Sequence, residues 1–148
     1  MANIGKWNDP TLTTVLSTEL NSLANATMTA ASATYDNSTN LNIYCDLEVA
    51  LASLSPTANA LVGIYLWCAP DGTNFPAQSD ADLRLTTTQM LCSISIGVTA
   101  ATAQRVVIRN LVLPPEKIQF KLDNQTGVAL NASGNTVKIL TYNINNNG

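Results

Sequence analysis

Apolar and polar residues alternate through three consecutive runs between Arg105 and Tyr142, and this alternation is the strongest structural signal in the chain. At period two, the apolar positions lie on one face of an extended strand. They are Val106, Ile108, Ile118, Phe120, Leu122, Val137 and Ile139. Most of the charged positions lie on the opposite face: Arg105, Arg109, Lys117, Lys121, Asp123 and Lys138. We therefore predict a one-sided antiparallel sheet of three strands that faces a second sheet.

Earlier parts of the chain carry the same period-two signal between turn-forming clusters. The predicted strands are a weak one over Met28–Tyr35, then Leu41–Leu51, Leu61–Ala69, and one strand over Leu83–Thr88 and Met90–Ile96 that is bent or bulged near Thr87. About seven or eight short strands with turn signals between them are typical of an all-β sandwich. We predict an antiparallel β-sandwich, jelly-roll-like or Ig-like, over residues 27–148. The polar end of the chain, from Ile144 onward, shows no packing signal.

The first 26 residues predict an N-terminal arm followed by a short helix. Asp9 and Pro10 are typical of an N-cap and a first helical position. Apolar residues then follow at helical spacing: Leu12, Val15, Leu16, Leu20 and Leu23. The arm and helix either pack on their own domain or dock onto a partner or a sibling subunit, and we favour docking for Trp7, because this large aromatic in the polar arm has little local core to join.

Composition and charge exclude several classes of function. Hydrophobic residues make up 46% of the chain and charged residues only 11%, with a net charge of −3. The basic residues form no cluster, so we expect neither nucleic-acid binding nor a polybasic membrane patch. A surface with so few charges provides little electrostatic repulsion against association with other copies or other proteins. The N-terminus lacks a secretory pattern, so we expect synthesis in the cytoplasm.

The chain has no histidine, which excludes catalytic triads and histidine-based metal sites. Asp46 and Glu48 share the polar face of one predicted strand, and we interpret them as solvated strand-face acids. Asp71, Asp80 and Asp82 lie in or near one loop, but they lack the regular spacing of a calcium loop. We therefore expect no enzyme activity, no metal and no cofactor.

The three cysteines, Cys45, Cys68 and Cys92, each lie within an apolar run and form no paired motif. We interpret them as reduced and buried, although one disulfide stays open as an alternative. Four glycosylation sequons begin at Asn25, Asn37, Asn124 and Asn131, and in a chain this rich in Asn and Thr we interpret them as coincidence.

Tyr65 and Trp67 fall on the face of the Leu61–Ala69 strand opposite its main apolar stripe. Three interpretations stay open for this aromatic pair, in order of preference: a second core layer, a contact with another subunit, and a platform for stacking on sugar rings.

Several segments together resemble small virion proteins of tailed bacteriophages, of the capsid decoration (cement) type. They are Asp46-Leu47-Glu48, the turn Pro70–Asn74, Leu113-Pro114-Pro115, Phe120–Gly127 and Ala132–Lys138. The resemblance covers about residues 41–142 and identifies no catalytic position, and the N-terminal arm departs from it.

The resemblance implies a β-sandwich that forms trimers on the outer surface of a phage head. The implied function is to bind the major capsid protein and stabilise the shell by bridging its subunits, on the capsid surface of the virion, after synthesis in the host bacterial cytoplasm. The alternative is a carbohydrate- or receptor-binding module of a head or tail fibre. Candidate contacts with the capsid or with sibling subunits are Trp7, Leu12, Leu16, Tyr65, Trp67, Pro114 and Pro115.

Overall fold

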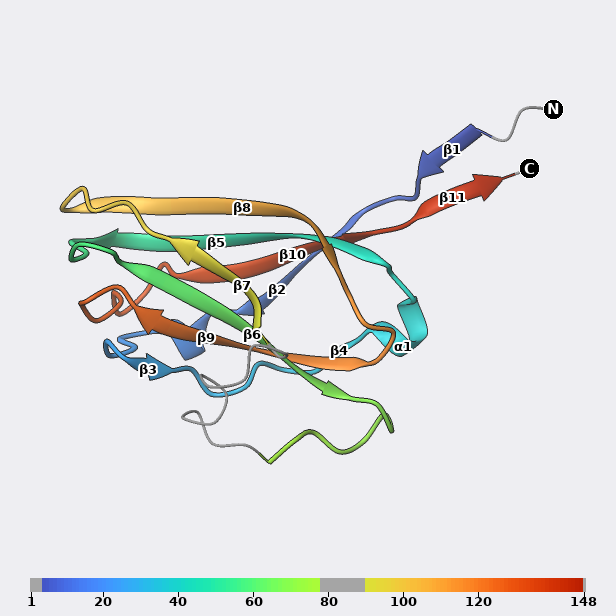
Figure 1. Cartoon of the computed structure of the whole chain (residues 1–148), viewed down its shortest axis with the longest axis horizontal. Helices are drawn as coiled ribbons and strands as arrows, with labels where there is room; N and C mark the ends of the chain where they lie inside the picture. The colour runs from blue at the N-terminus through green and yellow to red at the C-terminus, as the bar shows by residue number, and fades with distance from the viewer. Residues whose placement is uncertain (1–3, 78–89, 148) are drawn as a thin grey trace.

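Two antiparallel sheets packed face to face form the body of the protein in the computed structural model, which describes residues 4–77 and 90–147 (Figure 1). The first sheet has the strand order β2 (Thr11–Leu16), β10 (Thr136–Tyr142), β5 (Tyr44–Leu54) and β8 (Thr102–Val112). The second has the order β3 (Thr27–Met28), β9 (Lys117–Gln125), β6 (Leu61–Ala69) and β7 (Met90–Ser95), with β4 (Tyr35–Asp36) also paired to β9. The predicted all-β antiparallel sandwich is confirmed.

The strand pairs are nested like those of one long hairpin. β2 pairs with β10, β3 and β4 pair with β9, β5 pairs with β8, and β6 pairs with β7. The hairpin is then rolled up so that β10 meets β5 and β9 meets β6. This is the strand order of a jelly roll, in which long antiparallel pairs wrap around one core.

The sequence prediction for residues 105–142 is right about faces and wrong about the sheet. All seven apolar side chains of the three runs face the core between the sheets. The strands β8 and β10, however, belong to the first sheet, whereas β9 lies in the second. Alternation reports which side of a strand is apolar, but it carries no information on which sheet the strand joins.

The core is almost entirely aliphatic. Its largest fully buried side chains include Phe120, Leu47, Ile64, Ile118 and Ile139. β6 keeps the predicted bounds Leu61–Ala69, while β5 begins at Tyr44, three residues later than predicted. The segment before β5 forms a one-turn helix, α1 (Asn37–Asn40), which ends at Leu41. Leu41 and Ile43 are therefore exposed instead of continuing the strand. The first part of the bent strand predicted over residues 83–96, Leu83–Thr88, lies outside the described residues, and its second part is β7.

The helix predicted after Pro10 does not form, and a strand stands in its place. Residues 11–16 are β2, followed by a single 3₁₀ turn, η1 (Thr18–Leu20). Leu16 pairs with Val137 and Thr14 with Lys138, so Val15 is an extra residue in a β-bulge. The bulge lets Val15 and Leu16 both point into the core, which produces apolar spacing that resembles a helix. The β-branched sequence of the segment favours the strand.

Both termini extend beyond the sandwich as one two-stranded ribbon. β1 (Ile4–Trp7) pairs antiparallel with β11 (Ile144–Asn147), and Figure 1 shows the ribbon projecting from one end of the body. The predicted arm is therefore half of the ribbon, and the expectation that the C-terminal tail lacks packing partners is wrong. The ribbon continues the nesting of strand pairs outward by one step.

An irregular segment covers part of the edge of β9, where the sequence predicted a weak strand over residues 28–35. Only β3 and β4 are regular. Between them, the hydroxyls of Thr29 and Ser32 accept hydrogen bonds from the backbone N–H groups of Leu122 and Phe120, at 3.1 and 2.9 Å. Side-chain oxygens thus take the place of strand carbonyls and protect an edge that would otherwise be open.

Candidate docking surface

The outer face of the first sheet is a shallow, mixed apolar and charged surface that continues to the base of the ribbon. We call this face, together with the base of the ribbon, the docking surface. Its side chains come from every strand of the sheet and from β1: Trp7, Leu12, Asp46, Glu48, Val107, Arg109, Lys138, Leu140 and Tyr142. Trp7, Leu12 and Val107 leave 61%, 60% and 46% of their surface exposed. Large apolar side chains this open, gathered on one face, are typical of an interaction surface.

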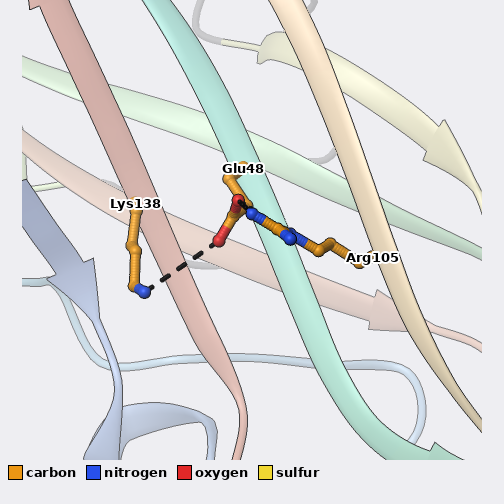
Figure 2. A network of polar contacts seen from close by, with 3 residues as sticks. All are labelled: Glu48, Arg105 and Lys138. Carbon is orange, nitrogen blue, oxygen red and sulfur yellow. Dashed lines mark hydrogen bonds and ion pairs between the residues drawn. The ribbon is translucent and has the colours of Figure 1, made fainter. Parts of the chain in front are cut away.

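Glu48 lies at the centre of the charged part of this surface (Figure 2). Its carboxylate accepts hydrogen bonds from Arg105 Nε at 2.9 Å and Nη2 at 2.5 Å, and Lys138 Nζ lies 4.0 Å from its other oxygen. The three side chains come from the adjacent strands β5, β8 and β10. Because Arg105 is largely exposed, water screens the pair and its contribution to stability is small.

Asp46 is held by its own chain. Its Oδ1 accepts a hydrogen bond from the Tyr142 hydroxyl at 2.8 Å and one from the Asn110 backbone N–H at 3.1 Å. Asn110 has a positive φ of 58° beside the register shift between β5 and β8, a conformation that asparagine tolerates better than most residues. Burial, followed by the hydrogen bond to Asp46, raises the pKa of Tyr142 to about 12.

Aromatic rings stack where the ribbon leaves the sandwich. The Tyr142 ring meets the Trp7 ring edge-on at a centroid distance of 5.0 Å and stacks on Tyr44 at 5.9 Å. Such pairs contribute about 0.5–1.5 kcal/mol each beyond the area that they bury. One face of Trp7 stays open to solvent, so the ring is positioned but not covered.

Two asparagines fix the base of the ribbon. Asn8 N–H donates to the Asn143 carbonyl at 3.1 Å, and Asn8 Oδ1 accepts from Asn143 N–H at 2.5 Å. The Asn143 side chain also accepts from Ile43 N–H at 2.6 Å and donates to the Leu41 carbonyl at 3.0 Å. No sequence signal distinguishes these two asparagines in a chain this rich in asparagine.

A cavity of about 380 Å³ opens at the base of the ribbon. Trp7, Pro10 and Leu140 give it apolar walls, and Asp46 and Arg109 give it charged ones. A cavity of this size accommodates one or two side chains of a partner.

The outer face of the second sheet is different, because the chain itself covers it. Tyr65 is only 3% exposed and packs with Met28 and the half-buried Trp67. Lys121 and Asp123, which the alternation placed toward solvent, are 8% and 4% exposed. The preferred interpretation of Tyr65 and Trp67, a second core layer, agrees with this burial.

A cation occupies one face of the Trp67 ring. Lys121 Nζ lies 4.1 Å from the ring centroid. The indole N–H of Trp67 is buried without an acceptor among the described residues. With its partner Tyr65 buried, this pair offers no open platform for a sugar ring.

On the docking surface the structure brings together two of the seven contact residues predicted from the sequence, Trp7 and Leu12, whereas Tyr65 and Trp67 pack together on the other sheet. Leu16 is in the core at 1% exposure. Pro114 and Pro115 lie in the connection from β8 to β9, and the Pro114 carbonyl accepts a hydrogen bond from the Asn37 side chain at 2.8 Å. The role of these seven residues as contacts stays a prediction.

The cysteines are free thiols, and none is paired. Burial raises the pKa of the Cys45 thiol to about 12 and those of Cys68 and Cys92 to about 11. Among residues 4–77 and 90–147, no group of three or more acidic or cysteine side chains is arranged to hold a metal ion. No helix in the same ranges is long and apolar enough to span a membrane.

The loop aspartates and the sequons have local structural roles where the structure describes them. Asp71 accepts hydrogen bonds from the N–H groups of Thr73 and Asn74, and the bond from Asn74 lowers its pKa to about 2. Asp80 and Asp82 lie outside the described residues. Asn37 and Asn124 are fully buried with their amides hydrogen-bonded to backbone carbonyls, so they are closed to glycosylation in the folded chain.

Comparisons with known proteins give distant structural likenesses only. A scan against protein-family models finds no match, and no curated protein matches the sequence. The fold is similar to a chain of Desmodium yellow mottle tymovirus, with a TM-score of 0.42, 13% identity, and coverage of 96% of this chain and 87% of that one. For a chain of turnip yellow mosaic virus the TM-score is 0.40 at 14% identity, with coverage of 96% of this chain and 80% of that one. For a chain of infectious bursal disease virus, Gt strain, the TM-score is 0.33 at 10% identity, with coverage of 91% of this chain and 31% of that one.

Proposed function

We propose that this protein is a structural protein of a virion, and specifically a decoration protein of a bacteriophage head. It binds the outer surface of the shell and stabilises it by bridging major capsid protein subunits. The observation that carries the proposal is the docking surface, an open and partly apolar sheet face continuous with a projecting ribbon. The resemblance of residues 41–142 to phage decoration proteins supports the same role.

The ribbon gives a physical reason to expect a partner. A two-stranded hairpin alone is marginally stable in water, and here only the base of the ribbon rests on the sandwich. Contact with a neighbouring subunit would bury the ribbon and Trp7 together. Repeated over many copies on one shell, even a modest contact stabilises the particle strongly, because each bound copy links subunits that are already held near one another.

We propose a homotrimer as the bound form. The low charge fraction of 11% leaves little electrostatic repulsion between copies, and the phage resemblance implies trimers. Light scattering coupled to size exclusion tests this in solution, where the expected mass is three times that of the chain. If the chain is a monomer at micromolar concentration, a trimer in solution is refuted and trimers could form only on the shell.

The copy number in purified virions tests the proposed function itself. Quantitative mass spectrometry of gradient-purified particles should find this chain at a number comparable to the major capsid protein. Particles from which the chain has been stripped should lose resistance to heat and regain it when the purified chain is added back. A handful of copies per particle, or no rebinding to stripped shells, would refute the decoration role.

A further inference from the structure

One cation on the docking surface, Arg109, has a side chain without a partner among the described residues. This side chain is exposed and, within residues 4–77 and 90–147, makes neither an ion pair nor a hydrogen bond. The neighbouring charges are satisfied: Glu48 binds Arg105 and lies near Lys138, and Asp46 accepts from Tyr142. The surface therefore holds one guanidinium that is free to bind an anion from outside.

Apolar side chains lie beside Arg109 in two adjoining hollows, which charged side chains also line. Arg109 lines the cavity with Trp7 and Leu140, and it lines an adjoining hollow with Leu12 and Val107. A ligand that satisfied Arg109 would thus place an apolar group against these walls in the same pose. The two acidic residues on the same surface, Asp46 and Glu48, disfavour a polyanion such as nucleic acid, because closely spaced phosphates would meet them.

We propose that the docking surface recognises an extended peptide segment of a shell protein, in which a single Asp or Glu side chain is flanked by an apolar residue. This rests on the proposed function and names the chemistry of its partner. The carboxylate of the segment pairs with the Arg109 guanidinium, which favours two parallel hydrogen bonds to one carboxylate. The apolar residue enters the cavity between Trp7 and Leu140.

A second copy of this chain fits the surface less well, since its own described carboxylates are mostly occupied. Those that already accept hydrogen bonds within the chain are Glu19, Asp36, Asp46, Glu48, Asp71 and Asp123. Of the other two described carboxylates, Glu116 is half-buried and hydrogen-bonded with the Cys68 thiol, whereas Asp9 is exposed and is the natural candidate in a self-contact. The Asp9→Asn variant therefore separates a contact between copies from a contact with another protein.

Rebinding to stripped shells tests the proposal. Arg109→Gln should weaken binding roughly tenfold, because it removes a charge-assisted bidentate pair. Arg109→Lys should recover part of the loss. Arg105→Gln is the matched control on the same strand: Arg105 is already paired with Glu48, so its binding should stay within about twofold of wild type. Unchanged binding of Arg109→Gln would overturn the proposal, and failure of the wild-type chain to rebind would instead refute the decoration role.

Photo-crosslinking identifies the occupant directly. With p-benzoylphenylalanine at position 107, beside Arg109, the residue captured on reassembled shells can be mapped by mass spectrometry. We expect a segment of a shell protein with Asp or Glu next to an apolar residue. Capture of this chain itself, with loss of capture in Asp9→Asn, would assign the surface to self-association and overturn the proposal. Capture of a segment without an acidic residue would overturn it equally.

Discussion

The two sheets of this sandwich follow the same alternation of apolar and polar residues, yet their outer faces meet different surroundings. On the first sheet, Leu12 and Val107 are 60% and 46% exposed, and the charged residues lie in reach of solvent. On the second, Tyr65 is 3% exposed, and a lysine and an aspartate are nearly as buried. One face is open, and the chain closes the other.

The difference separates groups that stabilise this chain from groups that are available to another one. A side chain buried by its own chain contributes to folding, and its removal leaves a cavity. An exposed apolar side chain contributes little to folding, but it can be buried by a partner. The outer face of the second sheet therefore contributes to the stability of the folded chain, whereas the docking surface is left available to a partner.

The largest test of this contrast exchanges one apolar side chain on each face for alanine. Tyr65→Ala should lower the free energy of unfolding by about 3 kcal/mol, because it empties a buried site next to Met28. Leu12→Ala, on the open face, should change it by no more than about 0.5 kcal/mol. Urea unfolding monitored by circular dichroism measures both. Equal losses would mean that the two faces are equally important for folding.

A second test compares two lysines that the alternation treats alike. Lys121→Met should lower stability by about 2 kcal/mol, because a desolvated ammonium over an indole ring is a strong contact. Lys138→Met, on the first sheet, should cost less than about 0.5 kcal/mol, since Lys138 only approaches Glu48 at 4.0 Å. The same urea unfolding measurements provide the comparison. If Lys121→Met leaves the free energy of unfolding unchanged, the contact between Lys121 and Trp67 contributes no more to stability than an exposed lysine does.

The outer faces of the two sheets show which features of the fold the apolar–polar alternation predicts and which it does not. Period two correctly predicted which residues of β8, β9 and β10 face the core, because the pleat requires it. It misassigned Lys121 and Asp123, since alternation does not report what covers the outer side of a strand. Burial of an outward-facing pair depends on segments distant in sequence, and no local pattern encodes it.

The predictions for the two terminal segments were wrong for a different reason. A bulge at Val15 shifted the apolar positions of β2 from period two to a helical spacing, so the pattern predicted the wrong element. The C-terminal tail is polar, and its strand forms only because β1 pairs with it. Of the docking surface, Trp7 and Leu12 were predicted, whereas Arg109 was recognised only as one of several charged positions. That its side chain has no partner among the described residues is a property of the folded sheet.

Alkaline titration tests Tyr142, whose aromatic ring is buried although it belongs to the exposed docking surface. Burial raises the pKa of Tyr142 from an ordinary value near 10 to about 12. A raised folded pKa means that the protonated ring stabilises the fold fully below pH 10, and that this contribution is lost as the pH rises toward 12. The free energy of unfolding should therefore fall across that window, together with losses from the buried Cys45 thiol, whose pKa is also raised.

Tyr142→Phe isolates the contribution of the ring hydroxyl. The variant should be less stable at pH 7, because Asp46 loses a hydrogen-bond donor, and its decline between pH 10 and 12 should be shallower. Tyr44→Phe is the matched control, since it leaves the Tyr142 hydroxyl in place. Absorbance of tyrosinate near 295 nm, recorded beside thermal unfolding, follows the same event. An unchanged pH slope in Tyr142→Phe would show that this ring is open as well.

The smallest expected effect is at the centre of the open face. Glu48→Gln removes both ionic contacts shown in Figure 2, yet the loss should stay below about 1 kcal/mol at low salt and shrink at 1 M salt, because exposed pairs are screened. Binding should respond more than folding. Without Glu48, Arg105 and Lys138 are released beside Arg109, so the surface becomes more cationic and an acidic partner should bind with unchanged or higher affinity. Arg105→Gln tests the same pair from its other side, and weaker shell binding in Glu48→Gln would argue for a cationic partner instead.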